Sequence, residues 1–376
     1  MKRNSLGRAS AVAVATFVLG AVLAGVPAAA KAELQKVIIR FSADLPPAPH
    51  PTAVAMNWFK EQVEAQFPKG SEVRNFFAGG LYKDPDAMKA MTQGNLEMGW
   101  LITGKTASND IWLSIIGQPG ALTTVAAIHD LENQATGKML LARLRDKHNV
   151  VPFGFADLSF ALHVAGKQRM VSLDSLKGKK IRTFTATINP AVASWGASPV
   201  VMAFGEVPSA LESGVIDGLV TSIGGWRSVR EQAPYYTDMG ISTVTFDNYW
   251  VGASSRWFNR LNRDTQTKIS ALVAQAIVYQ NELNWCNDQL SIEAFKASKP
   301  SDPGIYVATP EEVKRLQAAI GNNVAGFLKE KLPEDARPWV DRYLADGRAA
   351  SARLASGTDP LEKLSCTKYE AVLKSK

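Results

Sequence analysis

The chain has 376 residues, of which 46% are hydrophobic and 20% are charged, a composition typical of a globular protein and not of a disordered or fibrous one. Two cysteines are too few for a disulfide scaffold, and the four histidines show no metal-ligand spacing, so we expect neither a metal centre nor a cofactor. The length predicts two domains.

The N-terminal residues 1–32 have the pattern of a secretory signal peptide. Three basic residues precede an apolar run over residues 11–26, and small-residue cleavage patterns end at Ala30 and Ala32. Cleavage after Ala32 removes four basic residues and no acidic one, which lowers the formal net charge from +7 to +3, too weak a charge to indicate nucleic-acid binding. An uncleaved anchor is the alternative, but no later apolar run approaches the roughly 20 residues that span a bilayer. We therefore expect an exported protein with a cleaved signal peptide.

The first predicted elements are a strand, a loop and a helix. Residues 37–41 form a nearly continuous apolar run, which is typical of a buried parallel strand. A proline-rich loop follows over residues 44–51. Residues 52–67 then place apolar side chains at helical spacing, and this order is that of an α/β domain.

A helix–glycine–strand unit occurs twice along the chain. Asp84 is predicted to cap a helix that ends at Gly94, with a strand over residues 96–102. A helix over residues 208–213 and a strand over residues 215–220 repeat this order about 120 residues later. The repetition indicates two lobes of related topology, although such units are common enough to recur by chance.

The longest predicted helix covers residues 264–295, with Ile269, Ala276, Leu283 and Leu290 at seven-residue intervals. Its length would be about 48 Å at 1.5 Å per residue, more than the width of one small domain. Such a helix could brace two domains or form a coiled coil, and we favour the brace. The pattern Thr309-Pro310-Glu311-Glu312 is a capping box that predicts the start of a mostly helical C-terminal region.

Residues 99–106 match the phosphate-loop pattern G-x-x-x-x-G-K-[ST] letter for letter. The Trp-Leu-Ile sequence within the match is typical of a strand that enters a core, whereas a phosphate loop needs small, turn-forming residues there. We therefore predict no nucleotide site. The chain has no G-x-S-x-G elbow and no H-E-x-x-H motif, although carboxylates such as Asp44 and Asp217 could be paired in an exported hydrolase.

The two cysteines are Cys286 and Cys366. An exported location permits a disulfide between them. They could equally be two small buried hydrophobic residues.

Residues 177–184 contain the arginine that we consider the best candidate for ligand binding. Gly178 predicts a turn, and residues 180–184 alternate as a short strand that would place Arg182 near its carboxyl end. Ligands of open α/β sheets bind outside those ends, and a guanidinium can hold a carboxylate with two hydrogen bonds. The alternative is an ordinary surface arginine.

The order of these segments resembles a known family, the substrate-binding proteins of tripartite ATP-independent periplasmic (TRAP) transporters, of the dicarboxylate-binding type. The resemblance covers essentially all of the mature chain. It is carried by residues 76–100, 173–183 and 196–222, and by the long helix with Trp257 just before it.

The resemblance implies an α/β fold of the periplasmic binding protein type. Two α/β lobes would surround a ligand cleft, joined by crossing strands and a long bracing helix. The first lobe would contain residues 33–158 and about 247–287, and the second residues 159–246 and about 288–376.

The resemblance also implies the ligand-binding residues. Arg182 would form the salt bridge with the substrate carboxylate, Phe204 would pack against the ligand, and Thr221 stands where many members have an asparagine that hydrogen-bonds to it. Asp44 lies in the loop that offers a polar contact. His163 stands where many relatives have a second arginine.

Trp100 is a further candidate, as part of an aromatic wall. Thr221, His163 and Asp44 depart from the common family pattern, and these departures leave the identity of the acid open.

The function implied is that of a non-enzymatic receptor, which we expect to be monomeric. It would capture a small organic carboxylate and deliver it to an integral-membrane permease driven by an ion gradient, without binding nucleic acid. The alternatives are the binding protein of an ATP-driven importer or sensor, an exported hydrolase, or a coiled-coil assembly through residues 264–295.

Overall fold

The structure is a computed structural model that describes residues 33–160, 162–241, 243–245 and 247–374. The predicted signal peptide, residues 1–32, lies outside the described residues. Leu34–Lys376 groups as one compact unit. Within the described ranges, no helix combines the length and the apolar character that crossing a membrane requires.

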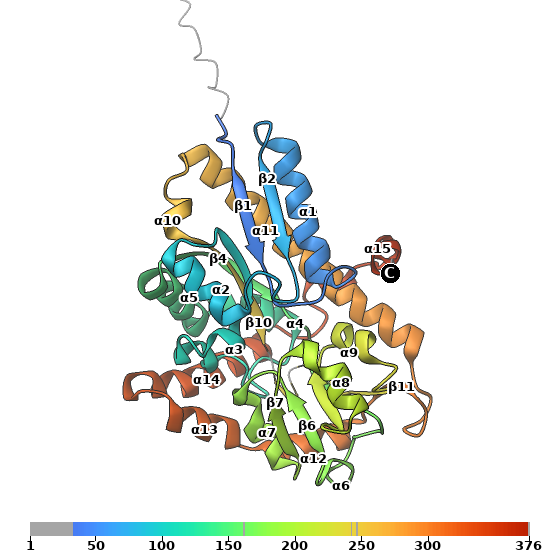
Figure 1. Cartoon of the computed structure of the whole chain (residues 1–376). Helices are drawn as coiled ribbons and strands as arrows, with labels where there is room; N and C mark the ends of the chain where they lie inside the picture. The colour runs from blue at the N-terminus through green and yellow to red at the C-terminus, as the bar shows by residue number, and fades with distance from the viewer. Residues whose placement is uncertain (1–32, 161, 242, 246, 375–376) are drawn as a thin grey trace, which may run out of the picture. The chain divides into compact units, whose positions relative to one another are not determined.

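The first of two mixed sheets has five strands in the order β2–β1–β3–β10–β4. Figure 1 shows β1 and β2 side by side. Its strands are β1 (Ile38–Ser42), β2 (Glu72–Phe76), β3 (Met98–Ile102), β4 (Val150–Asp157) and β10 (Asn248–Ser254). Strand β1 pairs in parallel with β2 and β3, whereas β10 is antiparallel to β3 and β4. The strands predicted over residues 37–41 and 96–102 correspond to β1 and β3. All five residues of β3 are buried, as expected of a strand covered on both faces.

The second sheet has six strands in the order β11–β9–β5–β8–β6–β7. They are β5 (His163–Gly166), β6 (Lys180–Thr183), β7 (Ser198–Val201), β8 (Gly218–Thr221), β9 (Tyr235–Asp238) and β11 (Gly304–Val307). Strand β6 is parallel to β7 and β8, and β5 is antiparallel to β8 and β9. The predicted turn at Gly178 has a φ of +73°, a conformation that glycine adopts without steric cost.

Helices surround both sheets. Those in the first part of the chain are α1 (Pro51–Gln66), α2 (Asp84–Gln93), α3 (Thr103–Thr106), α4 (Val125–His129), α5 (Ala135–His148), α6 (Leu173–Leu176), α7 (Asn189–Ser194), α8 (Val207–Glu212), α9 (Ile223–Val229) and α10 (Ser255–Phe258). Those in the last part are α11 (Arg263–Phe295), α12 (Pro310–Ile320), α13 (Asn323–Lys331), α14 (Arg337–Arg353) and α15 (Glu370–Lys374). The predicted capping box is present at the start of α12, where Thr309 and Glu312 bond to each other's backbone N–H groups.

The long helix α11 connects the two sheets. Its 33 residues match the helix predicted over residues 264–295, and the Asn262 side chain caps its first turn. The helix contacts α1 and β4 beside the first sheet, and α9 and β11 beside the second. Its heptad residues Ile269, Ala276 and Leu283 are buried within the chain, so this face packs against the protein's own core.

The start of α2 differs from the sequence prediction. Asp84 was expected to cap the helix, but Lys83 occupies the N-cap position and Asp84 is the first helical residue. The Asp84 carboxylate instead accepts hydrogen bonds from the backbone N–H groups of Asp44 and Ile102, each at 3.2 Å. The residue therefore ties the loop after β1 to the end of β3.

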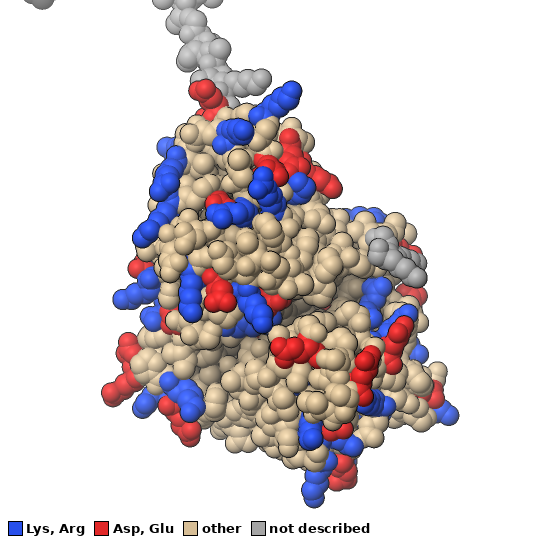
Figure 2. Space-filling model, viewed as in Figure 1, with Lys and Arg blue, Asp and Glu red and all other residues tan. Residues whose placement is uncertain are grey.

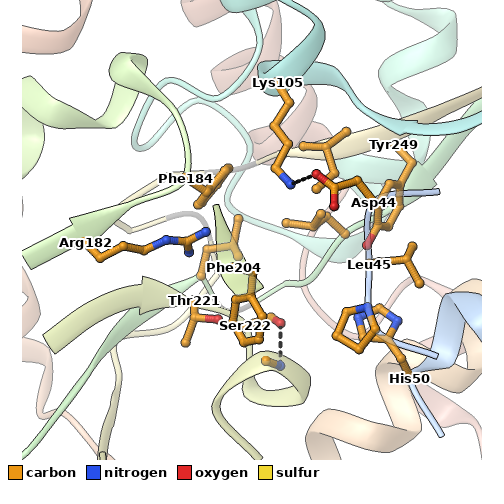
Figure 3. Close-up of a pocket in the computed structure, with 15 residues that line it drawn as sticks. Asp44, Leu45, His50, Lys105, Arg182, Phe184, Phe204, Thr221, Ser222 and Tyr249 are labelled. Atoms are coloured by element: carbon orange, nitrogen blue, oxygen red, sulfur yellow. Dashed lines mark hydrogen bonds and ion pairs between the residues drawn. The ribbon is translucent and has the colours of Figure 1, made fainter. Parts of the chain in front are cut away.

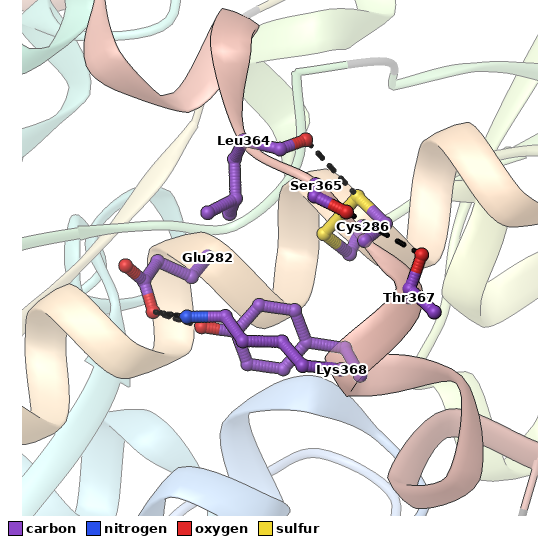
Figure 4. Close-up of a disulfide and its surroundings, with 8 residues drawn as sticks. Glu282, Cys286, Leu364, Ser365, Thr367 and Lys368 are labelled. Carbon is purple, nitrogen blue, oxygen red and sulfur yellow. Dashed lines mark hydrogen bonds and ion pairs between the residues drawn. A yellow bond between two sulfur atoms is a disulfide. The ribbon is translucent and has the colours of Figure 1, made fainter.

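Cys286 and Cys366 form a disulfide, which settles the two possibilities left open by the sequence (Figure 4). Their Cα atoms are 5.2 Å apart and the two residues are separated by 80 positions. The disulfide joins α11 to the C-terminal segment. The Tyr369 hydroxyl donates a hydrogen bond to Glu282 on the same helix and reinforces this connection.

We predict that the Cys286→Ala/Cys366→Ala double variant loses roughly 4–5 kcal/mol of unfolding free energy, because the unfolded chain regains the entropy of a loop of this size. Urea denaturation of both proteins under oxidising conditions measures the difference. An added reductant should destabilise only the wild-type protein. Equal midpoints would show that the disulfide contributes nothing to stability.

A second connection to the C-terminal segment is electrostatic. His129 lies between two carboxylates, with Nε2 at 2.9 Å from Asp157 and Nδ1 at 2.7 Å from Asp359. Burial alone would lower the pKa of His129, but the two carboxylates more than offset it and raise the pKa from 6.5 to about 10. The imidazolium therefore joins the end of β4 to the segment after α14.

The charged His129 between Asp157 and Asp359 predicts that the unfolding free energy depends on pH. Because the pKa of His129 is raised in the folded state, its ion pairs contribute fully to the unfolding free energy below pH 6.5. This contribution is lost as the pH rises towards 10. The unfolding free energy should fall by up to about 1.4 kcal/mol per pH unit in this window. We expect urea denaturation between pH 7 and pH 9 to show a smaller decline in His129→Gln than in the wild type. An identical decline of the unfolding free energy with pH in the two proteins would show that the ion pairs of His129 do not stabilise the fold.

Candidate functional site

A pocket lies between the two sheets, lined by residues from both (Figure 3). It is partly open to solvent, and its mostly apolar lining with a few polar side chains is typical of a small-molecule site. The lining residues are Asp44, Leu45, Pro46, His50, Ile102, Lys105, Leu158, Leu162, Arg182, Phe184, Phe204, Thr221, Ser222, Gly225 and Tyr249. Figure 2 shows the surface hollowed between the part of the chain around β1 and the part around β6.

The pocket forms where parallel strands end. Strands β1 and β3 end at Ser42 and Ile102, and β6 and β8 end at Thr183 and Thr221. Their carboxyl ends, and the loops that follow them, supply most of the polar lining. This is the position where open α/β sheets bind ligands.

Arg182 projects from β6 into the pocket with only 2% of its surface exposed. Its Nε donates to the carbonyl of Met202 at 3.1 Å and its Nη1 to the carbonyl of Val220 at 3.2 Å. Burial lowers the pKa of Arg182 from 12.5 to about 10, and Asp44 and Glu206 offset this only in part. The guanidinium is therefore charged at neutral pH.

No carboxylate of the described residues forms an ion pair with this guanidinium, although Asp44 and Glu206 act on it through space. The rings of Phe184 and Phe204 lie 6.0 Å and 5.6 Å from its central carbon. Arg182 is thus a desolvated cation, held by neutral groups at the wall of a cavity. Such a group is costly to bury unless an anion joins it.

Asp44 faces the pocket from the opposite side and is paired with Lys105. The Lys105 Nζ lies 2.9 Å from the Asp44 carboxylate, and both side chains are largely buried. The backbone N–H of Gly104 donates to Asp247, whose carboxylate is so close that a Cβ atom at position 104 would lie 2.4 Å from its oxygen. Only glycine fits there, and this close contact positions α3 with Lys105 beside the pocket.

His50 and Thr221 add polar atoms to the pocket. The His50 Nδ1 accepts the N–H of Thr52 at 3.3 Å, and burial lowers the pKa of His50 to about 4, so its ring is neutral and its Nε2 carries the proton. Thr221 ends β8, and a Cβ atom at Gly225 would lie 2.3 Å from its hydroxyl oxygen. The glycine lets α9 approach the end of the strand.

Four of the six candidate residues from the sequence line this one pocket: Arg182, Phe204, Thr221 and Asp44. Trp100 does not. Its indole is fully buried in the core of the first sheet, 6.1 Å from the ring of Phe41.

His163 also lies outside the pocket lining. It is 1% exposed, its Nε2 bonds to the carbonyl of Gly240 at 2.7 Å, and its Nδ1 accepts the N–H of Met239 at 3.1 Å. Both ring nitrogens are therefore engaged with the backbone beyond β9.

Sequence reasoning missed Lys105 and His50. Lys105 is the lysine of the phosphate-loop match, and the rejection of a nucleotide site left it without a role. His50 ends a proline-rich loop and has no motif of its own. His50 lies in the loop after β1 and Lys105 in the helix after β3, so only the folded chain brings these side chains to one pocket.

Comparison with known proteins identifies the family. Residues 42–331 match the family described as bacterial extracellular solute-binding protein, family 7 (DctP). The matched region is most of the chain, so the protein belongs to this family of non-enzymatic binding proteins. The predicted resemblance is confirmed.

Curated relatives and solved structures agree with this assignment. The C4-dicarboxylate-binding periplasmic protein DctP of Rhodobacter capsulatus is 23% identical over 282 residues, which are 74% of this chain and 83% of that protein.

Two crystal structures share the fold with a TM-score of 0.72. One is the sugar acid binding protein of Advenella mimigardefordensis with galactonate, at 20% identity over 85% of this chain and 100% of that chain. The other is a TRAP solute-binding protein of Shewanella oneidensis with succinate, at 19% identity over 83% of this chain and 100% of that chain. These likenesses confirm the predicted fold class.

Proposed function

We propose that this protein is the periplasmic receptor of a TRAP transporter and that it captures a small organic carboxylate in the pocket between its sheets. The observation that carries the proposal is Arg182, a charged guanidinium at 2% exposure that forms no ion pair with a carboxylate of the described residues. A ligand carboxylate would supply the missing anion and could accept two parallel N–H bonds.

The lining of the pocket supports the roles that the resemblance implies. Arg182 would hold the carboxylate, Phe204 would pack against the ligand, and Thr221 and Asp44 would offer polar contacts. Several solved relatives contain acids, namely galacturonate, galactonate, succinate and pyroglutamic acid. Each of these ligands carries a carboxylate, which supports an acid as the ligand here.

We propose that two lobes close around this acid. The lobes would follow the predicted boundaries, residues 33–158 with about 247–287 and residues 159–246 with about 288–376, because this division keeps each sheet within one lobe. Closure can be driven by binding only if the ligand makes tighter contacts in the closed form. Burial of the carboxylate against Arg182 would provide such contacts.

Export and delivery complete the proposal. Cleavage after Ala32 would release the mature chain into the periplasm, where relatives such as the Rhodobacter capsulatus protein are named as periplasmic. A monomer would then pass the acid to integral-membrane permease subunits, the partners that membership in this transporter class implies.

The test is calorimetry with the arginine removed. We expect Arg182→Ala to weaken binding of the captured acid by roughly 2–5 kcal/mol, because the carboxylate would be buried without its partner. Arg182→Lys keeps the charge but loses the planar fork, so we expect an intermediate loss.

Arg145→Ala is the matched control, since Arg145 is 60% exposed and pairs only with its neighbour Asp146 among the described residues. Its affinity should equal that of the wild type. If Arg182→Ala bound the acid as tightly as the control while retaining a normal melting curve, Arg182 would not be the anchor.

A further inference from the structure

We infer that the pocket selects acids with a single carboxylate and discriminates against dicarboxylates. This inference rests on the proposed function, because it takes Arg182 as the anchor of one carboxylate. It concerns what the remaining side chains of the pocket can do for a second one.

The charges of the side chains that line the pocket favour a ligand with one carboxylate. Three side chains in the pocket are formally charged, namely Arg182, Lys105 and Asp44. Lys105 and Asp44 neutralise each other at 2.9 Å, with side-chain exposures of 12% and 19%. The pocket therefore holds a net charge of +1 that resides on Arg182, which matches a monoanion and not a dianion.

The other polar groups near the pocket offer no positive charge to a second carboxylate. His50 carries no charge at neutral pH, because burial lowers its pKa to about 4. His163, at the position where the resemblance implies a second arginine, is turned towards the backbone of Met239 and Gly240. The cations of the two adjoining hollows do not line this pocket: Lys83 and Lys331 belong to one hollow, and Arg227 and Arg230 to the other.

A second carboxylate would meet a mostly apolar wall of the pocket. The wall on the side of the first sheet is largely apolar, formed by Leu45, Ile102, Leu158 and Leu162, each at most 9% exposed. A carboxylate placed there would lose its water and gain no counter-charge.

The test uses two matched pairs of acids that differ only by the second carboxylate. Pentanoate is compared with glutarate, and gluconate with glucarate, by calorimetry on the mature full-length chain at pH 7.5. We expect the monocarboxylate that binds to have an affinity at least tenfold above that of its partner diacid. A diacid that binds as tightly as its partner, or more tightly, overturns the inference.

A variant tests the cause of the selectivity. Asp44→Asn releases Lys105, so the affinity for the diacid relative to the monoacid should rise at least tenfold. The double variant Asp44→Asn/Lys105→Met removes the freed cation and should lose this gain. An unchanged ratio in a folded Asp44→Asn protein contradicts the charge argument, and the wild-type panel decides the inference even if the variant does not fold.

The panel also separates this inference from the proposed function. Tight binding of diacids that Arg182→Ala abolishes would overturn the selectivity but retain the arginine as anchor. If the folded wild-type protein bound none of these acids, the selectivity and the proposed carboxylate receptor would both fail.

Discussion

The structure depends on one electrostatic imbalance, the charged guanidinium of Arg182 in a pocket where no carboxylate of the described residues forms an ion pair with it. Two backbone carbonyls and two phenylalanine rings surround it, and they compensate only part of the lost hydration. The folded protein therefore carries an unfavourable burial that a bound carboxylate would relieve. A receptor gains from this arrangement, because the ligand supplies the interaction that favours the bound state.

The rest of the fold holds this cation opposite a neutral wall. Parallel strands of both sheets end at the pocket, and the buried carboxylate of Asp84 fixes the loop that carries Asp44 to the end of β3. Lys105 then neutralises Asp44. Because burial raises the pKa of Asp84 to about 6, this carboxylate is less easily ionised than an exposed one. Helix α11 and the disulfide to Cys366 connect the elements around both sheets.

Local features of the fold were predictable from the sequence because short-range patterns determine them. Helix α11, the capping box at Thr309 and strand β1 follow from periodicity, cap chemistry and a continuous apolar run. The insertion of β10 between β3 and β4 joins segments about 100 and 150 residues apart, and no local pattern encodes that pairing.

In the pocket, too, some residues could be predicted from local sequence patterns and others could not. Arg182 could be singled out because it follows a turn and lies near the end of a short strand. The neutralisation of Asp44 by Lys105 could not, because the two residues are 61 positions apart and meet only in the folded chain. Trp100 shows the opposite case, since it was a candidate for an aromatic wall of the pocket, whereas its ring is fully buried in the core of the first sheet.

A crystal structure of the mature protein with its captured acid would test directly whether Arg182 holds the ligand. We expect the ligand carboxylate to lie against Arg182, with oxygen atoms about 2.7–2.9 Å from the guanidinium nitrogens. A ligand whose carboxylate lies elsewhere, with Arg182 still bonded only to the carbonyls of Met202 and Val220, would contradict this expectation.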